Sequence, residues 1–102
     1  MIEKTFDTSH GTIHYWINSR GACKGLQLVF LPGLTADHRL FDKQMEHFSG
    51  KANLLVWDPP AHGDSRPFAL DFTMDDFAFM LHDVLADAGV TKPVLVGQSM
   101  GG

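Results

Sequence analysis

The sequence predicts an α/β fold in which a mostly parallel sheet carries helices on both faces. Short apolar runs alternate along the chain with segments whose apolar residues recur at helical spacing, and such alternation is typical of βαβ units. Several of these runs are almost wholly apolar, as expected for strands that are covered on both faces. The expected order is β-β-β-α-β-α-β, and the 102 residues suit one domain spanning 1–102.

The first two strands are predicted to form a hairpin. Residues 12–18 alternate between apolar and polar side chains, which is typical of a strand with two unlike faces. Residues 2–8 should pair with this strand through a turn at 9–11. Three later strands are predicted where apolar residues run together, at 26–31, 53–57 and 93–96.

Two helices are predicted between these later strands. Apolar residues recur at helical spacing over 41–48, and Gly50 closes that segment. The second helix should open at Thr73, with Asp76 as a partner in an arrangement like a capping box, and should end at Gly89. Its expected apolar stripe consists of Phe77, Leu81, Val84, Leu85 and Ala88.

The charge pattern argues against nucleic acid and anionic membranes as partners. The chain has eight basic and 12 acidic residues, its formal net charge is −4, and no basic stretch occurs. The dinucleotide fingerprint and the phosphate-loop pattern are also absent, so we expect no cofactor. The single cysteine, Cys23, excludes a disulfide within the chain, and the N-terminus lacks the apolar stretch of a signal peptide. We therefore expect a cytoplasmic location.

The most informative motif is the G-x-S-x-G pattern at 97–101, directly after the apolar run 93–96. In a nucleophile elbow, a serine on a tight strand-to-helix turn has its hydroxyl lifted clear of the sheet edge. Gly97 and Gly101 flank Ser99 here, as such a strained turn requires. The alternative interpretation of the pattern alone is a flexible tail.

Together with two upstream segments, this motif makes the chain resemble the N-terminal portion of an α/β-hydrolase-fold serine hydrolase. The segment 29–34 (VFLPGL) stands where the family has an apolar strand ending in His-Gly, and 58–65 (DPPAHGDS) is close to the family's D-x-P-G-x-G-x-S loop. Pro32 replaces the usual His and Ala61 a usual Gly, and neither position carries the chemistry in the family. The resemblance implies that 1–102 is an incomplete α/β-hydrolase domain.

The resemblance also assigns roles at the elbow. Ser99 would be the nucleophile, and the backbone N–H groups of Met100 and Leu34 would form the oxyanion hole. Gly33 would let the loop after the third strand approach the substrate closely. In this fold the acid and the histidine of the triad follow the serine along the chain. Only residues 100–102 follow it here, so we expect little or no turnover from this chain alone.

The remaining polar residues have plainer expected roles. His62 matches a structural position in the family, where the imidazole can brace its loop, and a solvated helix start is favoured for His38 over a pocket-lining role. His10 and His14 would share a strand face, but no third ligand accompanies them, so we expect no metal site. Asp58 ends a strand and should hold the loop that follows it.

Two classes of function follow. The first is a serine hydrolase that acts on a small-molecule ester, thioester, lactone or amide through an acyl-enzyme. A serine at this position argues against dehalogenase and epoxide-hydrolase relatives, which the family equips with Asp. The alternative is a truncated or pseudo-enzyme chain that binds a partner through its open sheet edge. In either case, the strand 93–96 would be that edge, and it invites a complementing chain or self-association.

Overall fold

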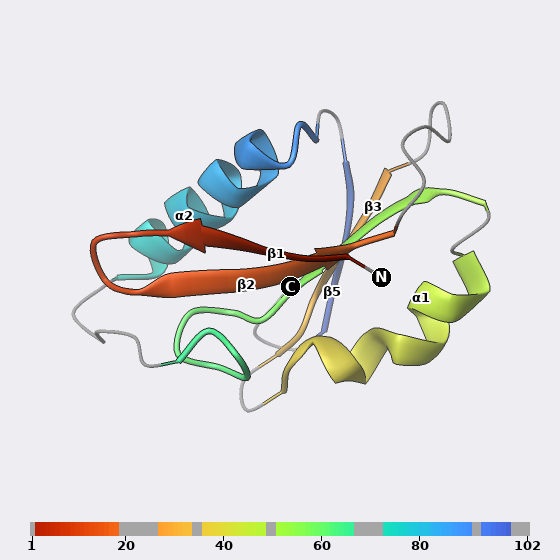
Figure 1. The fold of residues 1–102 in the computed structure, drawn as a ribbon, viewed down its shortest axis with the longest axis horizontal. Helices are drawn as coiled ribbons and strands as arrows, with labels where there is room; N and C mark the ends of the chain where they lie inside the picture. The colour runs from red at the N-terminus through yellow and green to blue at the C-terminus, as the bar shows by residue number, and fades with distance from the viewer. Residues whose placement is uncertain are drawn as a thin grey trace.

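The structure is a computed structural model, and it describes residues 2–18, 27–33, 36–48, 51–66, 73–90 and 93–98. The elements in these ranges follow one another in the predicted order (Figure 1). They are β1 (Ile2–Asp7), β2 (Thr12–Ile17), β3 (Gln27–Leu31), the 3-10 turn η1 (His38–Phe41), α1 (Asp42–Phe48), β4 (Asn53–Trp57), α2 (Met74–Asp87) and β5 (Val94–Gly97).

The strands form a single mixed sheet in the order β1-β2-β4-β3-β5. The hairpin β1–β2 is antiparallel and joins β4 in antiparallel fashion, whereas β3 runs parallel to both β4 and β5. The predicted α/β architecture is confirmed, with its parallel pairing concentrated in β4, β3 and β5. These three strands carry the apolar runs, because each is covered on both faces.

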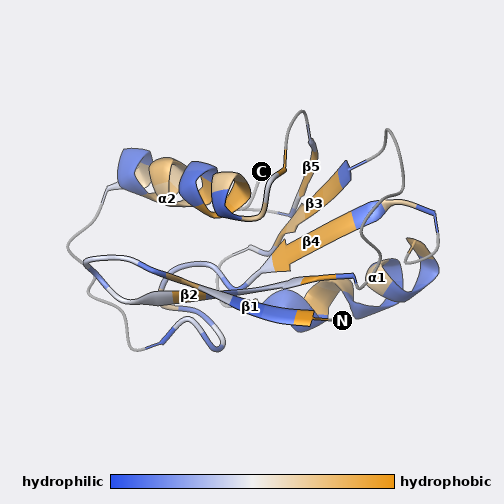
Figure 2. Cartoon of the chain, turned by 45° about the horizontal axis from the view of Figure 1, so that its top comes forward, coloured by the Kyte–Doolittle hydropathy of each residue, from blue (hydrophilic) through white to orange (hydrophobic). Residues whose placement is uncertain are grey.

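The two helices cover opposite faces of the sheet (Figure 2). Side chains alternate along each strand, so Val29 of β3 and Leu55 of β4 face α2, whereas Phe30 and Val56 face α1. The core layer under α2 contains Ile13, Tyr15, Val29, Leu31, Leu55, Trp57, Met80 and Val84. The layer under α1 contains Phe30, Phe41, Met45, Ala52, Leu54 and Val56.

Local sequence signals set the limits of α2. Thr73 and Asp76 form the predicted capping box, in which each side chain accepts from the other residue's backbone N–H. Gly89 follows the helix with a φ of 73°, a left-handed conformation that glycine adopts without a steric cost. The predicted apolar stripe packs on the sheet, with Met80 added to it. Tyr15 of β2 also donates a hydrogen bond of 2.7 Å to Asp87, which ties the helix to the hairpin.

Among the described residues, no helix has both the length and the apolar character needed to cross a bilayer. The cytoplasmic location stays a prediction.

Within the described ranges, β5 is an edge of the sheet, as predicted from the sequence. Val94 is 49% exposed and Leu95 is 53% exposed, although both belong to a parallel strand with an apolar sequence. Leu95 pairs with Val29, which is fully buried on the α2 face. The exposed strand therefore extends the apolar surface of the core to the border of the sheet, which is the arrangement that favours edge-to-edge association.

We expect Leu95→Lys to reduce self-association of the 102-residue chain, because a lysine on an edge strand opposes pairing with a second edge. Leu40→Lys is the matched control, since Leu40 is 47% exposed but lies in η1 and not on the sheet edge. Sedimentation velocity of the wild-type chain and both variants at equal concentration provides the measurement. Equal association in wild type and L95K, or an equal reduction in L40K, would contradict the role assigned to β5.

Candidate active site

The C-terminal ends of β4, β3 and β5 meet at one edge of the sheet, because these strands run parallel. Leu31, the last residue of β3, pairs with Gly97, the last residue of β5. The backbone N–H of Gln98 then donates to the Leu31 carbonyl over 3.1 Å. The loop after β3 and the segment after β5 therefore leave the sheet side by side, at the edge where open α/β sheets bind ligands.

The structure describes two of the six residues predicted for the site. Gly33 is buried just beyond β3, and Gly97 ends β5. The other four lie outside the described residues: Leu34, Ser99, Met100 and Gly101. The nucleophile and the oxyanion donors therefore stay predictions from the sequence, whereas the two strands that lead to them have a defined register.

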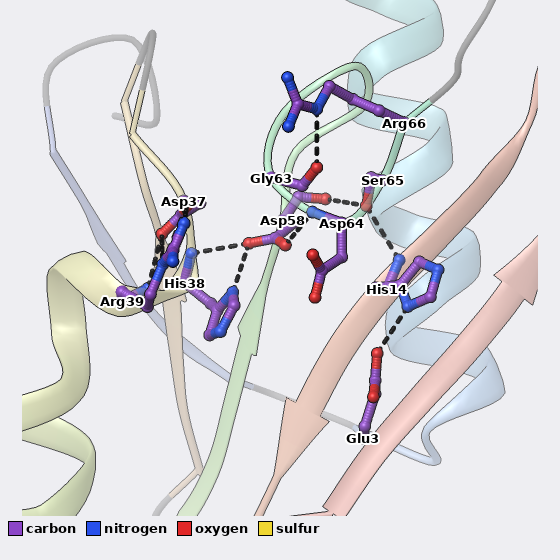
Figure 3. A network of polar contacts seen from close by, with 10 residues as sticks. All are labelled: Glu3, His14, Asp37, His38, Arg39, Asp58, Gly63, Asp64, Ser65 and Arg66. Atoms are coloured by element: carbon purple, nitrogen blue, oxygen red, sulfur yellow. Dashed lines mark hydrogen bonds and ion pairs between the residues drawn. The ribbon is translucent and has the colours of Figure 1, made fainter.

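A network of polar contacts centred on Asp58 joins the loops after β3 and β4 (Figure 3). The Asp58 side chain is completely buried directly after β4. Its Oδ1 accepts from the backbone N–H of His38 at 2.7 Å and from His38 Nδ1 at 2.8 Å, while Oδ2 accepts from the Asp64 N–H at 2.7 Å. The expectation that Asp58 holds the following loop is confirmed, and the carboxylate holds the preceding loop as well.

The favoured assignment of His38 to a solvated helix start is wrong. Its side chain is only 21% exposed, and its ring stacks on Trp16 with 3.6 Å between ring centroids. The ring is drawn inward because the buried Asp58 carboxylate needs donors, since burial of an unpaired charge is costly. An aspartate between an apolar strand and two prolines was the sequence signal that could have indicated such a need.

Ser65 is a structural residue of this edge that the sequence did not single out. Its buried hydroxyl donates to the Asp58 carbonyl at 2.7 Å and accepts from the His14 N–H at 2.9 Å. The Asp58 N–H in turn donates to the His14 carbonyl at 2.9 Å. One serine thus joins β2 to the loop after β4, and the His14 ring is separately paired with Glu3 at 2.7 Å.

The loop after β4 contains two residues with positive φ, Ala61 at 69° and Gly63 at 49°. A Cβ on Gly63 would lie 2.3 Å from Asp58 Oδ2, so only glycine fits against the buried carboxylate. His62 lies between them. Its N–H donates to the Pro59 carbonyl at 2.9 Å, and its Nδ1 lies 3.0 Å from the Pro60 carbonyl. The predicted bracing role of His62 is therefore confirmed.

Asp37 lies beside the network and caps η1. Hydrogen bonding to the Arg39 side chain lowers the pKa of Asp37 to about 2, so this pair stays ionised at neutral pH. Ligand atoms of Asp37, His38 and Asp58 lie within 4.8 Å of one another. Arg39 and the donors described above already occupy these carboxylates, and a cation would have to displace those contacts.

Comparison with known proteins identifies the fold family. The profile of a family described as "alpha/beta hydrolase fold" matches residues 27–102. The magnesium-chelatase 30 kDa subunit of Rhodobacter capsulatus is 32% identical over 93 residues, which are 90% of this chain and 33% of that protein. The (E)-2-((N-methylformamido)methylene)succinate hydrolase of Acinetobacter baylyi is 29% identical over 102 residues, which are 99% of this chain and 37% of that protein.

Solved structures agree with this result. N-acyl homoserine lactonase AidH complexed with N-butanoyl homoserine aligns with a TM-score of 0.84 at 25% identity, over 99% of this chain and 37% of that chain. MGS-M2, an alpha/beta hydrolase from a deep-sea metagenome library, has the same fold, with a TM-score of 0.85 at 24% identity, over 96% of this chain and 36% of that chain. The chain therefore belongs to the alpha/beta hydrolase fold family. It spans about a third of the length of the relatives it matches.

The two residues with positive φ should respond oppositely to substitution. We expect Ala61→Gly to stabilise the fold by about 0.5–1 kcal/mol, because an L-residue in the left-handed region costs roughly 1 kcal/mol or more. Gly63→Ala should destabilise it by more than about 2 kcal/mol, since the added Cβ meets the buried Asp58 carboxylate. Urea unfolding of both variants checks this pair. A stabilising G63A or a destabilising A61G would contradict the loop geometry.

Proposed function

We propose that the chain is the N-terminal part of a serine hydrolase that cleaves an ester, thioester, lactone or amide of a small molecule through an acyl-enzyme. The observation that carries this proposal is the pairing of Leu31 with Gly97 at the C-terminal edge of the sheet. In the sequence, Leu34 follows Leu31 by three residues and Ser99 follows Gly97 by two. The register therefore supports an arrangement in which the hydroxyl and the oxyanion donors share one edge.

In the proposed reaction, the Ser99 hydroxyl attacks the substrate carbonyl and transfers its proton to a histidine base. Negative charge then develops on the carbonyl oxygen, and the backbone N–H groups of Leu34 and Met100 stabilise it. Collapse of the tetrahedral intermediate expels the alcohol, thiol or amine and leaves an acyl-serine. Water, activated by the same histidine, releases the acid and restores Ser99.

The acid and the histidine of the triad would come from polypeptide other than residues 1–102, either further along the same chain or in a second chain. In the α/β-hydrolase fold both follow the nucleophile in sequence. The described histidines have other tasks: His38 is held by Asp58, His62 by Pro60 and His14 by Glu3. These contacts argue against any of the three as the base.

The printed names of the relatives support a carbonyl compound as substrate. One relative is a hydrolase of a methylformamido succinate compound, and another is a lactonase of N-acyl homoserine lactones. Both names describe small molecules, and neither implies a metal or an organic cofactor. We therefore propose an acyl substrate of that size class, with no cofactor, for this chain as well.

A second candidate function is partner binding without catalysis. The exposed Val94 and Leu95 on the edge strand β5 favour it, since strand addition to an open edge is a common mode of peptide recognition. One relative is named as a subunit of a magnesium chelatase, which is consistent with a role in an assembly.

Reaction with a fluorophosphonate probe separates the two candidates. In the natural gene product that contains these residues, we expect one covalent adduct, mapped to Ser99 and absent in Ser99→Ala. Ser9→Ala is the control, because Ser9 is an exposed residue of the hairpin turn. The 102-residue chain alone should react slower by a factor of about 1,000 or more, since triad members act as a unit. An adduct that persists in S99A, or none in the gene product, would contradict the hydrolase proposal.

A further inference from the structure

We propose that Asp58 and His38 form a clamp that positions the loop after β3, and with it the oxyanion donor at Leu34. The clamp is defined by the two contacts from His38 to Asp58 Oδ1. This inference rests on the proposed serine hydrolase and assigns two positioning residues to that site.

The two contacts fix both the backbone and the side chain of His38. The backbone N–H and the ring Nδ1 of His38 donate to the same oxygen of Asp58, at 2.7 and 2.8 Å. A single side-chain contact would leave the local backbone free to rotate, whereas two contacts from one residue do not. The position of the polypeptide at residue 38 is therefore set by the end of β4.

The constraint extends from His38 to the oxyanion loop through a short turn. The Ala36 N–H donates to the Gly33 carbonyl at 3.0 Å, which closes the segment 33–36 that contains Leu34. Gly33 is buried and directly continues the loop that leaves β3. The segment is thus held by β3 at its start and by Asp58, through His38, just beyond its end.

The clamp itself has a rigid support. Asp58 is fully buried, and its second oxygen accepts from the Asp64 N–H at 2.7 Å. Gly63 lies so close to the carboxylate that a Cβ would overlap it. On the other side, the His38 ring stacks on Trp16 of β2 at 3.6 Å between centroids. Each partner of the clamp therefore contacts an element that belongs to the sheet or to a tightly bonded loop.

Positioning explains this arrangement better than stability alone. A buried charged group paired with a polar partner is often no more stabilising than apolar residues of the same volume. An oxyanion hole, in contrast, depends on donors that are preorganised before charge develops. A displacement of about 1 Å in a catalytic group can cost about 100-fold in rate, so a clamp at this loop has a large effect on chemistry.

Two substitutions at His38 separate the ring donor from ring stacking. His38→Phe keeps an aromatic ring on Trp16 but removes the Nδ1 donor, whereas His38→Asn keeps a donor at the position of Nδ1 but removes the ring. His82→Phe is the matched control, since the His82 side chain is 80% exposed on α2. All are made in the natural gene product that contains these residues, and hydrolysis of p-nitrophenyl acetate is measured after titration of active sites with the fluorophosphonate.

For H38F we expect kcat to fall by about 10- to 100-fold with KM changed less than about twofold, and labelling of Ser99 to slow to a similar extent. H38N should retain kcat within about threefold, and H82F should match wild type. If H38F does not fold, a loss of kcat in folded H38N as large as 10-fold overturns the inference, because the donor is present there. Equal kcat in H38F and wild type also overturns it.

Failure of the underlying hydrolase proposal gives a different result. If wild type shows neither labelling of Ser99 nor hydrolysis, the proposed function is wrong and the clamp loses its role with it. If wild type is labelled on Ser99 but H38F reacts at the same rate, the hydrolase proposal stands and the positioning role alone is refuted. A purely structural role for His38 would lower the thermal midpoint of H38F without changing the rate per titrated site.

Discussion

The geometry of the candidate site depends on the buried carboxylate of Asp58. It accepts three N–H bonds from two loops, and its own backbone is bonded to His14 and to the Ser65 hydroxyl. A charge in the interior is tolerated only when its hydrogen bonds are complete, so the loops must close around it. The same requirement explains why Gly63 has no side chain, since a Cβ would occupy the space of the carboxylate.

The parallel register supplies the second constraint. Parallel strands bring their C-terminal ends to one edge, and the pairing of Leu31 with Gly97 sets the loop after β3 beside the segment after β5. The clamp at Asp58 then acts on a loop that the sheet has already placed. Exposure of Val94 and Leu95 on β5 belongs to the same plan, because a strand that is apolar on both sides is built to be covered.

Periodicity in the sequence predicted most of the fold, because each element has a local cause. Alternation in β2, the apolar runs of β3 and β4, and the capping box at Thr73 all depend on neighbouring residues. The environment of His38 could not be predicted in this way. It depends on contacts with Asp58 and Trp16, which are distant in sequence. Ser65 was missed for the same reason, since its partner His14 is 51 positions away.

The most direct test of a nucleophile and an oxyanion hole at this edge is a crystal structure of the phosphonylated natural gene product that contains these residues. We predict a bond from Ser99 Oγ to phosphorus, with the phosphoryl oxygen about 2.7–3.1 Å from the backbone nitrogens of Leu34 and Met100. The His38 contacts to Asp58 should be retained in that structure. Phosphorus on another residue, or a phosphoryl oxygen that points away from both nitrogens, would contradict the proposed site.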